Sequence, residues 1–175
     1  MALNKPARTR EEVEALLKNQ GVDLKKEKFA LVGIRKKGNK VGVWDDDFII
    51  IGEKQFFTFN GNTDPSREYP NVANLKPGVW RYKKGTHGSK AYGPYPAFRQ
   101  AAPVTVMRYI DGKTWKPDTG NFGINIHHGS KRSESTSSIG CQTVRYVDWE
   151  AFKNTIYMML TRYEKADFAY VLIQE

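Results

Sequence analysis

Residues 120–144 read GNFGINIHHGSKRSESTSSIGCQTV, a stretch that holds two of the three histidines and the only cysteine of the chain. Apolar and polar residues alternate over residues 122–127, which predicts a strand whose side chains point in turn to its two faces. The apolar face carries Phe122, Ile124 and Ile126. On this alternation His127 lies on the polar face, beside Asn125.

A polar loop follows this strand. Residues 129–138 are almost all small or polar and include five serines, a composition typical of an exposed loop. The loop leads to Gly140 and Cys141. A glycine at that point permits a sharp turn or a close approach of the backbone just before the thiol.

A thiol beside an imidazole can act as a nucleophile with its base. A neighbouring imidazolium lowers the pKa of a thiol and supplies the reactive thiolate. The same histidine can then protonate a leaving amine, and the backbone N–H groups of Gly140 and Cys141 could hold an oxyanion. The alternative interpretation is an inert buried thiol next to ordinary strand histidines.

The order His127, serine-rich loop, Ser138-Ile139-Gly140-Cys141 resembles the catalytic motif of the L,D-transpeptidase (YkuD-like) cysteine enzymes. Its form is similar to a divergent branch found in bacteriophage and other cell-wall-degrading proteins. The segments LKPGVW at 75–80 and FRQAAPV at 98–104 also resemble that branch, so the resemblance covers residues 60–160 loosely. It implies a mixed β-sandwich catalytic domain and a thioester formed with stem peptides of bacterial peptidoglycan.

Two departures from the family pattern concern residues near the cysteine. Ile139 replaces the histidine that usually precedes Gly-Cys, and Thr143 replaces the usual Arg or Asn. In the family a backbone carbonyl just after the catalytic histidine orients its ring, which assigns that role to His128 or Gly129. The spacing to the cysteine leaves His128 as an alternative base, whereas the strand alternation favours His127.

Four further residues are candidates for substrate binding. Ser138 and Asn125 adjoin the two catalytic positions. The planar guanidinium of Arg99 suits a substrate carboxylate. Tyr92, or alternatively Tyr95, in the glycine-, lysine- and tyrosine-rich residues 83–96, could stack on a sugar or peptide.

Length and composition indicate one globular catalytic domain over residues 1–175. Hydrophobic residues make up 39% and charged residues 27% of the chain, as in ordinary folded domains. Thr9 and Glu12 predict a capping box for a helix over residues 9–20, and Asp148 is expected to cap a long helix near residues 149–164. The expected class is α+β and strand-dominated, with strands at 29–34, 40–44, 48–51, 55–60, 79–82, 104–110, 122–127 and 168–173.

The net charge of +9 favours anionic partners, either nucleic acid or the bacterial cell wall. No motif of a specific nucleic-acid-binding module is present. No apolar run is long enough for a membrane span and no signal peptide is recognisable, so we expect synthesis in a cytoplasm and delivery to the wall after release. No cofactor and no metal are expected; a zinc site of His127, His128 and Cys141 is the alternative.

These observations predict a peptidoglycan hydrolase of the phage endolysin type, with Cys141 as nucleophile and His127 as base. A cross-linking L,D-transpeptidase is the alternative within the same class. A basic module that binds nucleic acid or the cell wall without catalysis is the alternative of another class. The sequence does not decide the oligomeric state.

Overall fold

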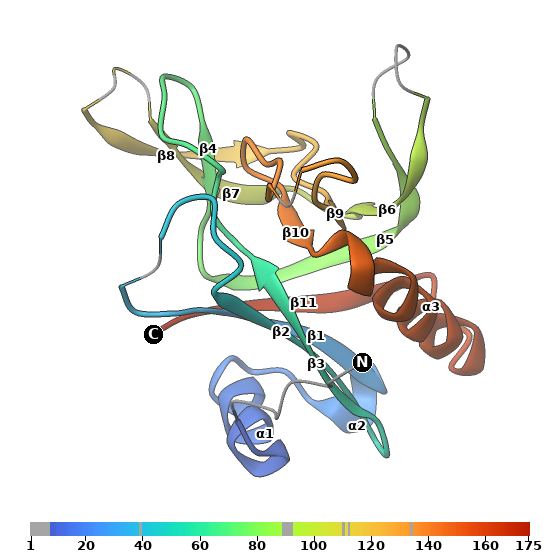
Figure 1. Ribbon diagram of the computed structural model, residues 1–175. Coiled ribbons are helices and arrows are strands. Elements are labelled where there is room, and N and C mark those ends of the chain that lie inside the picture. Colours follow the sequence, from blue (N-terminus) through green and yellow to red (C-terminus); the bar gives the residue numbers. More distant parts are fainter. Residues whose placement is uncertain (1–7, 39, 89–92, 110, 112, 134) are drawn as a thin grey trace.

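The computed structural model describes residues 8–38, 40–88, 93–109, 111, 113–133 and 135–175 (Figure 1). Within these residues it is an α+β, strand-dominated fold. The elements in chain order are α1 (Arg10–Asn19), α2 (Leu24–Glu27), β1 (Phe29–Arg35), β2 (Asp46–Gly52), β3 (Phe56–Asn62), β4 (Ala73–Leu75), β5 (Gly78–His87), β6 (Tyr95–Gln100), β7 (Val104–Tyr109), β8 (Trp115–Gly120), β9 (Ile126–His128), β10 (Gln142–Val144), α3 (Tyr146–Arg162) and β11 (Asp167–Gln174).

Eight strands form a sheet that closes on itself, in the order β1-β11-β5-β6-β9-β10-β3-β2. Neighbours are antiparallel except for β1 with β11 and β9 with β10, which are parallel. Strands β4, β7 and β8 form a separate three-stranded sheet. The predicted α+β, strand-dominated class is therefore confirmed. The particular L,D-transpeptidase-like mixed β-sandwich stays a prediction, and the large sheet of this structure closes on itself.

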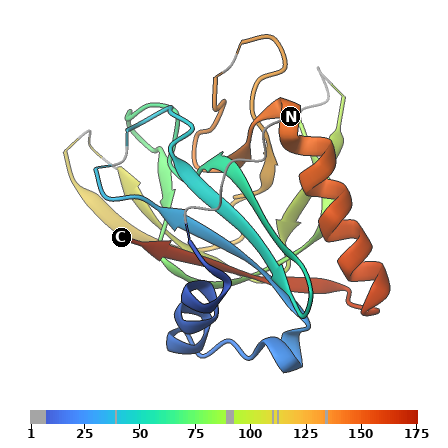
Figure 2. The same ribbon diagram turned by 60° about the horizontal axis from the view of Figure 1, so that its bottom comes forward.

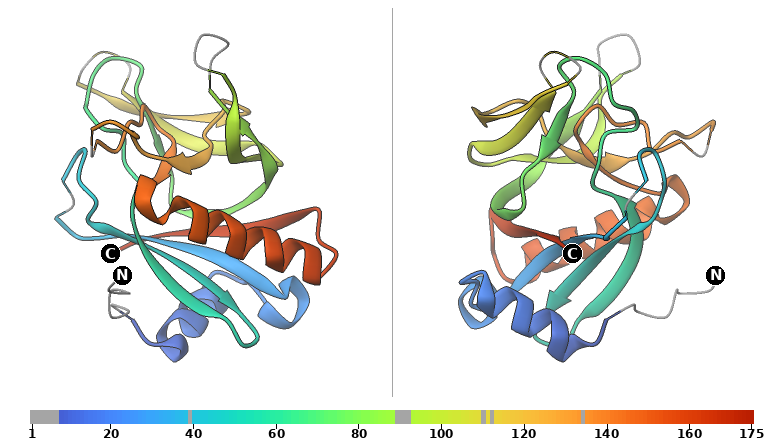
Figure 3. Two further views of the ribbon diagram at one scale, coloured as in Figure 1. Left: turned by 45° about the vertical axis from the view of Figure 1, so that its right-hand side comes forward. Right: turned by 90° about the vertical axis from the view of Figure 1, so that its left-hand side faces the viewer.

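Helices α1 and α3 pack on opposite sides of the wall made by β1 and β11 (Figures 2 and 3). Leu31 belongs to the main core with Phe152 and Ile156 of α3, whereas Val32 belongs to a second core with Val13 of α1. Both faces of β1 are thus covered by apolar side chains, and all seven of its residues are buried. This explains why β1 has a continuous apolar sequence rather than an alternating one.

The two long helices begin differently. The capping box predicted for α1 is confirmed, because Thr9 Oγ1 accepts from Glu12 N and the Glu12 carboxylate accepts from Thr9 N at 2.7 Å. The cap predicted for α3 is wrong. That helix starts at Tyr146, its N-cap Arg145 makes no side-chain cap, and Asp148 lies in the first turn, where a carboxylate interacts favourably with the helix dipole.

The strand predicted at residues 40–44 is also wrong, because this segment is a turn before β2. Lys40 N donates to Asp45 Oδ2 at 3.0 Å. Gly42 has φ +73°, and a Cβ there would lie 2.9 Å from Ser66 O. Local side-chain bonding and this left-handed glycine replace the ladder bonds of a strand.

A buried arginine ties the closed sheet to the small sheet. Arg35, 6% exposed, lies at the end of β1. Its guanidinium donates to Thr63 O at 2.6 Å and to Leu75 O of β4 at 3.1 Å, and it pairs with Asp64 at 3.2 Å. This network fixes the chain after β3 relative to β4. No helix among the described residues is long and apolar enough to cross a membrane.

Candidate active site

All three histidines and the cysteine lie in one region of the fold. His87 is the last residue of β5, His127 is the middle residue of β9, and Cys141 immediately precedes β10. Because β5 pairs with β6, β6 with β9 and β9 with β10, the three side chains meet on adjacent strands. One ligand atom of each of these three residues lies within 4.8 Å of the other two.

A backbone carbonyl holds the ring of His127. His127 Nδ1 lies 2.7 Å from His128 O and 3.1 Å from the hydroxyl of Tyr95. The carbonyl accepts from Nδ1–H, so the lone pair of the neutral ring is on Nε2. Of the two carbonyls predicted for this role, it is that of His128 that contacts the ring; the carbonyl of Gly129 instead lies 2.6 Å from His128 Nδ1.

His128 faces a different environment from His127. Its ring stacks on Tyr95 with centroids 4.4 Å apart and meets Tyr146 and Trp149 edge-on. Cys141 is grouped with His127 and His87, and His128 is outside that cluster. The alternation predicted from sequence thus agrees with the placement of His127 beside the thiol, although regular strand structure is confined to residues 126–128.

The thiol of Cys141 is buried but contacts polar groups. The residue is 6% exposed. Its Sγ accepts from Asn125 N and donates to Gly123 O, both at 3.4 Å. Burial raises the pKa of the Cys141 thiol to about 11, although the Asn125 N–H opposes this shift. The resting thiol is therefore protonated at neutral pH.

The His127 imidazole is also neutral at rest. Burial, followed by the nearby His87, lowers the pKa of His127 to about 3. Burial likewise lowers the pKa of His87, with a smaller effect of His128. The pair is thus a thiol and a neutral imidazole rather than a thiolate and an imidazolium, so a proton must move as the sulfur attacks.

Ser138 and Gly140 shape the turn that carries the thiol. Ser138 Oγ donates to Cys141 O at 2.6 Å and accepts from Gly140 N at 3.0 Å. Gly140 has φ +145°, and a Cβ there would lie 2.8 Å from Ala73 O. The predicted use of the Gly140 N–H for an oxyanion conflicts with its bond to Ser138, which leaves the Cys141 N–H as the remaining predicted donor.

Contacts with the segment between β3 and β4 anchor the loop that carries Ser138. Ser66 N donates to Ser138 O at 2.7 Å, and Ser138 N donates to Ser66 Oγ at 2.6 Å. With both its backbone and its hydroxyl engaged, Ser138 is placed to hold the turn. Its predicted contact with substrate stays a prediction.

Asn125 connects the thiol to His87. Its backbone N–H donates to Cys141 Sγ, and its side-chain Nδ2 lies 2.9 Å from His87 Nδ1. The residue is 7% exposed. Its Oδ1 is buried and finds no hydrogen-bond partner among the described residues. The predicted site residue is therefore in the site, where it contacts a histidine.

Of the other two predicted substrate residues, the structure describes Arg99, which is not part of this cluster. Arg99 is exposed on β6, opposite Lys83, and its side chain crosses Gly85. It shares a face of the β5–β6 pair with Tyr95, four residues away. Tyr92 lies outside the described residues.

The sequence prediction assigned no role to His87, and it named Tyr95 only as the alternative to Tyr92 for stacking on a substrate. Both lie in residues 83–96, where a loop was expected, but β5 continues to His87 and β6 begins at Tyr95, and these two residues pair directly. Burial raises the pKa of Tyr95 to about 12, with a smaller effect of Cys141. The rarity of histidine, with three in the chain, was the one signal that could have pointed to His87.

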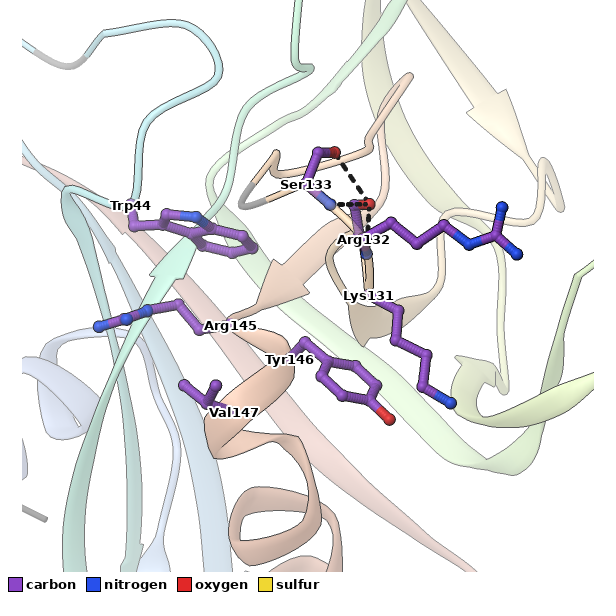
Figure 4. Close-up of a pocket in the computed structure, with 8 residues that line it drawn as sticks. Trp44, Lys131, Arg132, Ser133, Arg145, Tyr146 and Val147 are labelled. Carbon is purple, nitrogen blue, oxygen red and sulfur yellow. Dashed lines mark hydrogen bonds between the residues drawn. The ribbon is translucent and has the colours of Figure 1, made fainter.

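A basic pocket lies over the start of α3 and the loop that follows β9 (Figure 4). Trp44 and Tyr146 lie on two sides of it, and the three cationic side chains extend outward around it. The pocket has a volume of about 140 Å³ and is lined by Trp44, Ser130, Lys131, Arg132, Ser133, Arg145, Tyr146 and Val147, none of them acidic. Since the ring of Tyr146 also contacts the ring of His128, with 5.0 Å between their centroids, this basic pocket lies next to His128.

The chain matches no family model, no curated protein sequence and no solved structure.

Proposed function

We propose that this protein is a cysteine-dependent enzyme that hydrolyses stem peptides of bacterial peptidoglycan through a thioester acyl-enzyme. The observation that carries the proposal is the position of the His127 imidazole, held by the carbonyl of His128, within 4.8 Å of the only cysteine. The sequence resemblance of this segment to L,D-transpeptidase catalytic motifs supplies the substrate class and the expected catalytic fold.

The first half of the reaction forms the thioester. Cys141 Sγ attacks the carbonyl carbon of an amide while its proton passes to Nε2 of His127. The tetrahedral oxyanion accepts a hydrogen bond from the Cys141 N–H. As the C–N bond breaks, His127 returns the proton to the leaving amine. The hydrogen bond to His128 O stabilises the transient imidazolium in the required orientation.

The second half releases the acyl group. Water attacks the thioester with His127 as base, which yields a carboxylate and restores the thiol. An amine acceptor in place of water would give a cross-link instead. The proposal is hydrolysis, and the product of the assay described below distinguishes the two reactions.

Two surface features support an anionic, peptide-containing substrate. The basic pocket places Lys131, Arg132 and Arg145 near His128, and none of the described residues that line it is acidic. Ile139, 67% exposed, presents an apolar side chain two residues before the thiol, where it could contact the apolar part of a stem peptide. Binding to purified cell walls should consequently weaken with salt.

Mass spectrometry of muropeptides from purified sacculi tests the proposal. Sacculi incubated with the protein should release peptides cleaved in the stem, and the same amount of folded Cys141→Ala protein should release none. New cross-linked species would indicate transpeptidation. Unchanged muropeptides in the presence of folded wild-type protein would overturn the enzymatic proposal, and steeply salt-dependent DNA or RNA binding would then favour the nucleic-acid-binding alternative.

A further inference from the structure

His87, His127 and Cys141 are the three residue types that dominate zinc sites, and they converge from three separate strands. Their ligand atoms lie within 4.8 Å of one another. A tetrahedral Zn²⁺ with Zn–N near 2.0–2.1 Å and Zn–S near 2.3 Å needs ligand atoms about 3.5 Å apart. To hold one ion, the three ligand atoms must approach by about 1 Å, and the rings of His87 and His127, which stack with centroids 3.9 Å apart and an angle of 12° between their planes, must turn out of the stack so that a nitrogen lone pair of each points at the ion.

Hydrogen bonds engage the same nitrogen, Nδ1, of both rings. Nδ1 of His127 is bonded to His128 O and Nδ1 of His87 lies against the side-chain amide of Asn125, which leaves Nε2 of each ring as the ligand atom. A metal-bound histidine usually donates a hydrogen bond from its other ring nitrogen to a carbonyl or amide oxygen, because this bond fixes the tautomer and the direction of the ring.

The side chain of Asn125 can supply that oxygen. As placed, its Nδ2 faces His87, and its buried Oδ1 has no hydrogen-bond partner among the described residues. Rotation of the amide by 180° exchanges the two atoms, a choice that only the hydrogen-bond network decides. Oδ1 then accepts from His87 Nδ1–H, and Nε2 of His87 carries the lone pair that a metal requires.

We propose that His87, His127 and Cys141 form a binding site for one Zn²⁺ ion. Three protein ligands leave a fourth position for water or an anion, as in catalytic zinc sites. Binding releases the thiol proton to solvent, since the thiolate is the ligand. This ligand set differs from the sequence alternative, because His87 takes the place of His128, whose Nδ1 is bonded to Gly129 O.

Zinc binding would withdraw both Cys141 and His127 from catalysis. This consequence rests on the proposed function, whereas the binding itself does not. Under the proposal a stoichiometric amount of Zn²⁺ inhibits the enzyme, and a chelator restores activity.

Titration of the reduced, chelator-treated protein with Co²⁺, followed by displacement with Zn²⁺, tests the site. We expect thiolate-to-cobalt charge-transfer absorption that saturates at one ion per chain. His87→Ala and Cys141→Ser should each weaken binding by more than about 100-fold, and Asn125→Ala by about 10- to 100-fold. His128→Gln is the matched control and should bind as the wild type does, with circular dichroism confirming that every variant is folded.

Absence of the thiolate band, or an equal loss in His128→Gln and His87→Ala, would overturn the site. Muropeptide release measured with and without one equivalent of Zn²⁺ separates the two proposals. Loss of activity upon binding supports inhibition, and full activity with bound Zn²⁺ overturns it. A protein that binds Co²⁺ through the thiolate but is inactive after metal removal would retain the metal site and contradict the proposed function.

Discussion

The imidazole rings of His87 and His127 stack with centroids 3.9 Å apart and an angle of 12° between their planes. Forty positions separate these residues in the sequence, and the β5–β6–β9 ladder brings them together. The stack places a second titratable ring, that of His87, against His127, which we propose as the general base. As a result, the protonation of His127 depends on His87.

The first prediction concerns the pKa of His127. Burial and then His87 lower this pKa to about 3, so His87→Ala should raise it by admitting water and removing a like charge. The change can be followed by NMR titration of the His127 ring protons. His128→Gln, which removes a smaller contributor, should raise the pKa less. Equal pKa values in the wild type and His87→Ala would refute the coupling.

A second prediction concerns the reactivity of the thiol. Because burial raises the pKa of Cys141 to about 11, its thiolate fraction at pH 7 is about 100-fold lower than that of a thiol with pKa 9. Alkylation by iodoacetamide should be slow at pH 7 and should accelerate up to about pH 11. The denatured protein, in which the thiol is free, provides the control. Rapid alkylation of the folded protein at pH 6 would instead indicate a preformed thiolate–imidazolium pair.

Stability should fall in acid because of His127. Its pKa is lowered on folding, so the unfolded chain binds a proton below about pH 6.5 while the folded protein does not until about pH 3. The stabilising contribution is therefore present above pH 6.5 and is lost as the pH falls towards 3, a change on the order of 4 kcal/mol. Urea unfolding at pH 7, 5 and 4 should show a shallower decline for His127→Gln. Parallel curves for the two proteins would contradict this assignment.

Gly140 and Gly123 provide a matched pair of substitutions at the site. Both have positive φ, but a Cβ at Gly140 would lie 2.8 Å from Ala73 O, whereas at Gly123 it would meet nothing within 4 Å. Gly140→Ala should therefore lose about 1–3 kcal/mol more stability in urea unfolding than Gly123→Ala, because it combines a backbone clash with a φ of +145° that alanine adopts less readily than the +73° of Gly123. A similar loss in both would show that the turn before the thiol is not tightly packed.

Much of the sheet could be predicted because its strands carry a strong apolar pattern. The strands expected near 29–34, 48–51, 55–60 and 168–173 appear as β1, β2, β3 and β11. Short strands gave no such signal. β9 and β10 have three residues each, and their parallel pairing is set by contacts across the fold rather than by local sequence.

Part of the site could be predicted because it lies in a segment with a clear local alternation of apolar and polar residues. His127 and Cys141 lie within one recognisable stretch, so local alternation sufficed to place the histidine. His87 and Tyr95 lie in a segment rich in glycine, lysine and proline, which indicates a loop when read alone. Only the pairing of β5 with β6 and of β6 with β9 brings them to His127, and this long-range pairing is not encoded in local periodicity.

The central claim is that Cys141 forms a thioester with a peptidoglycan stem peptide. Intact-protein mass spectrometry of rapidly acid-quenched mixtures with stem-peptide substrate tests this claim most directly. The account predicts a mass increase equal to the acyl fragment, located on the peptide that contains Cys141, removed by hydroxylamine and absent from Cys141→Ser. Cleavage of the substrate by Cys141→Ser at the wild-type rate, with no adduct on the wild type, would contradict it.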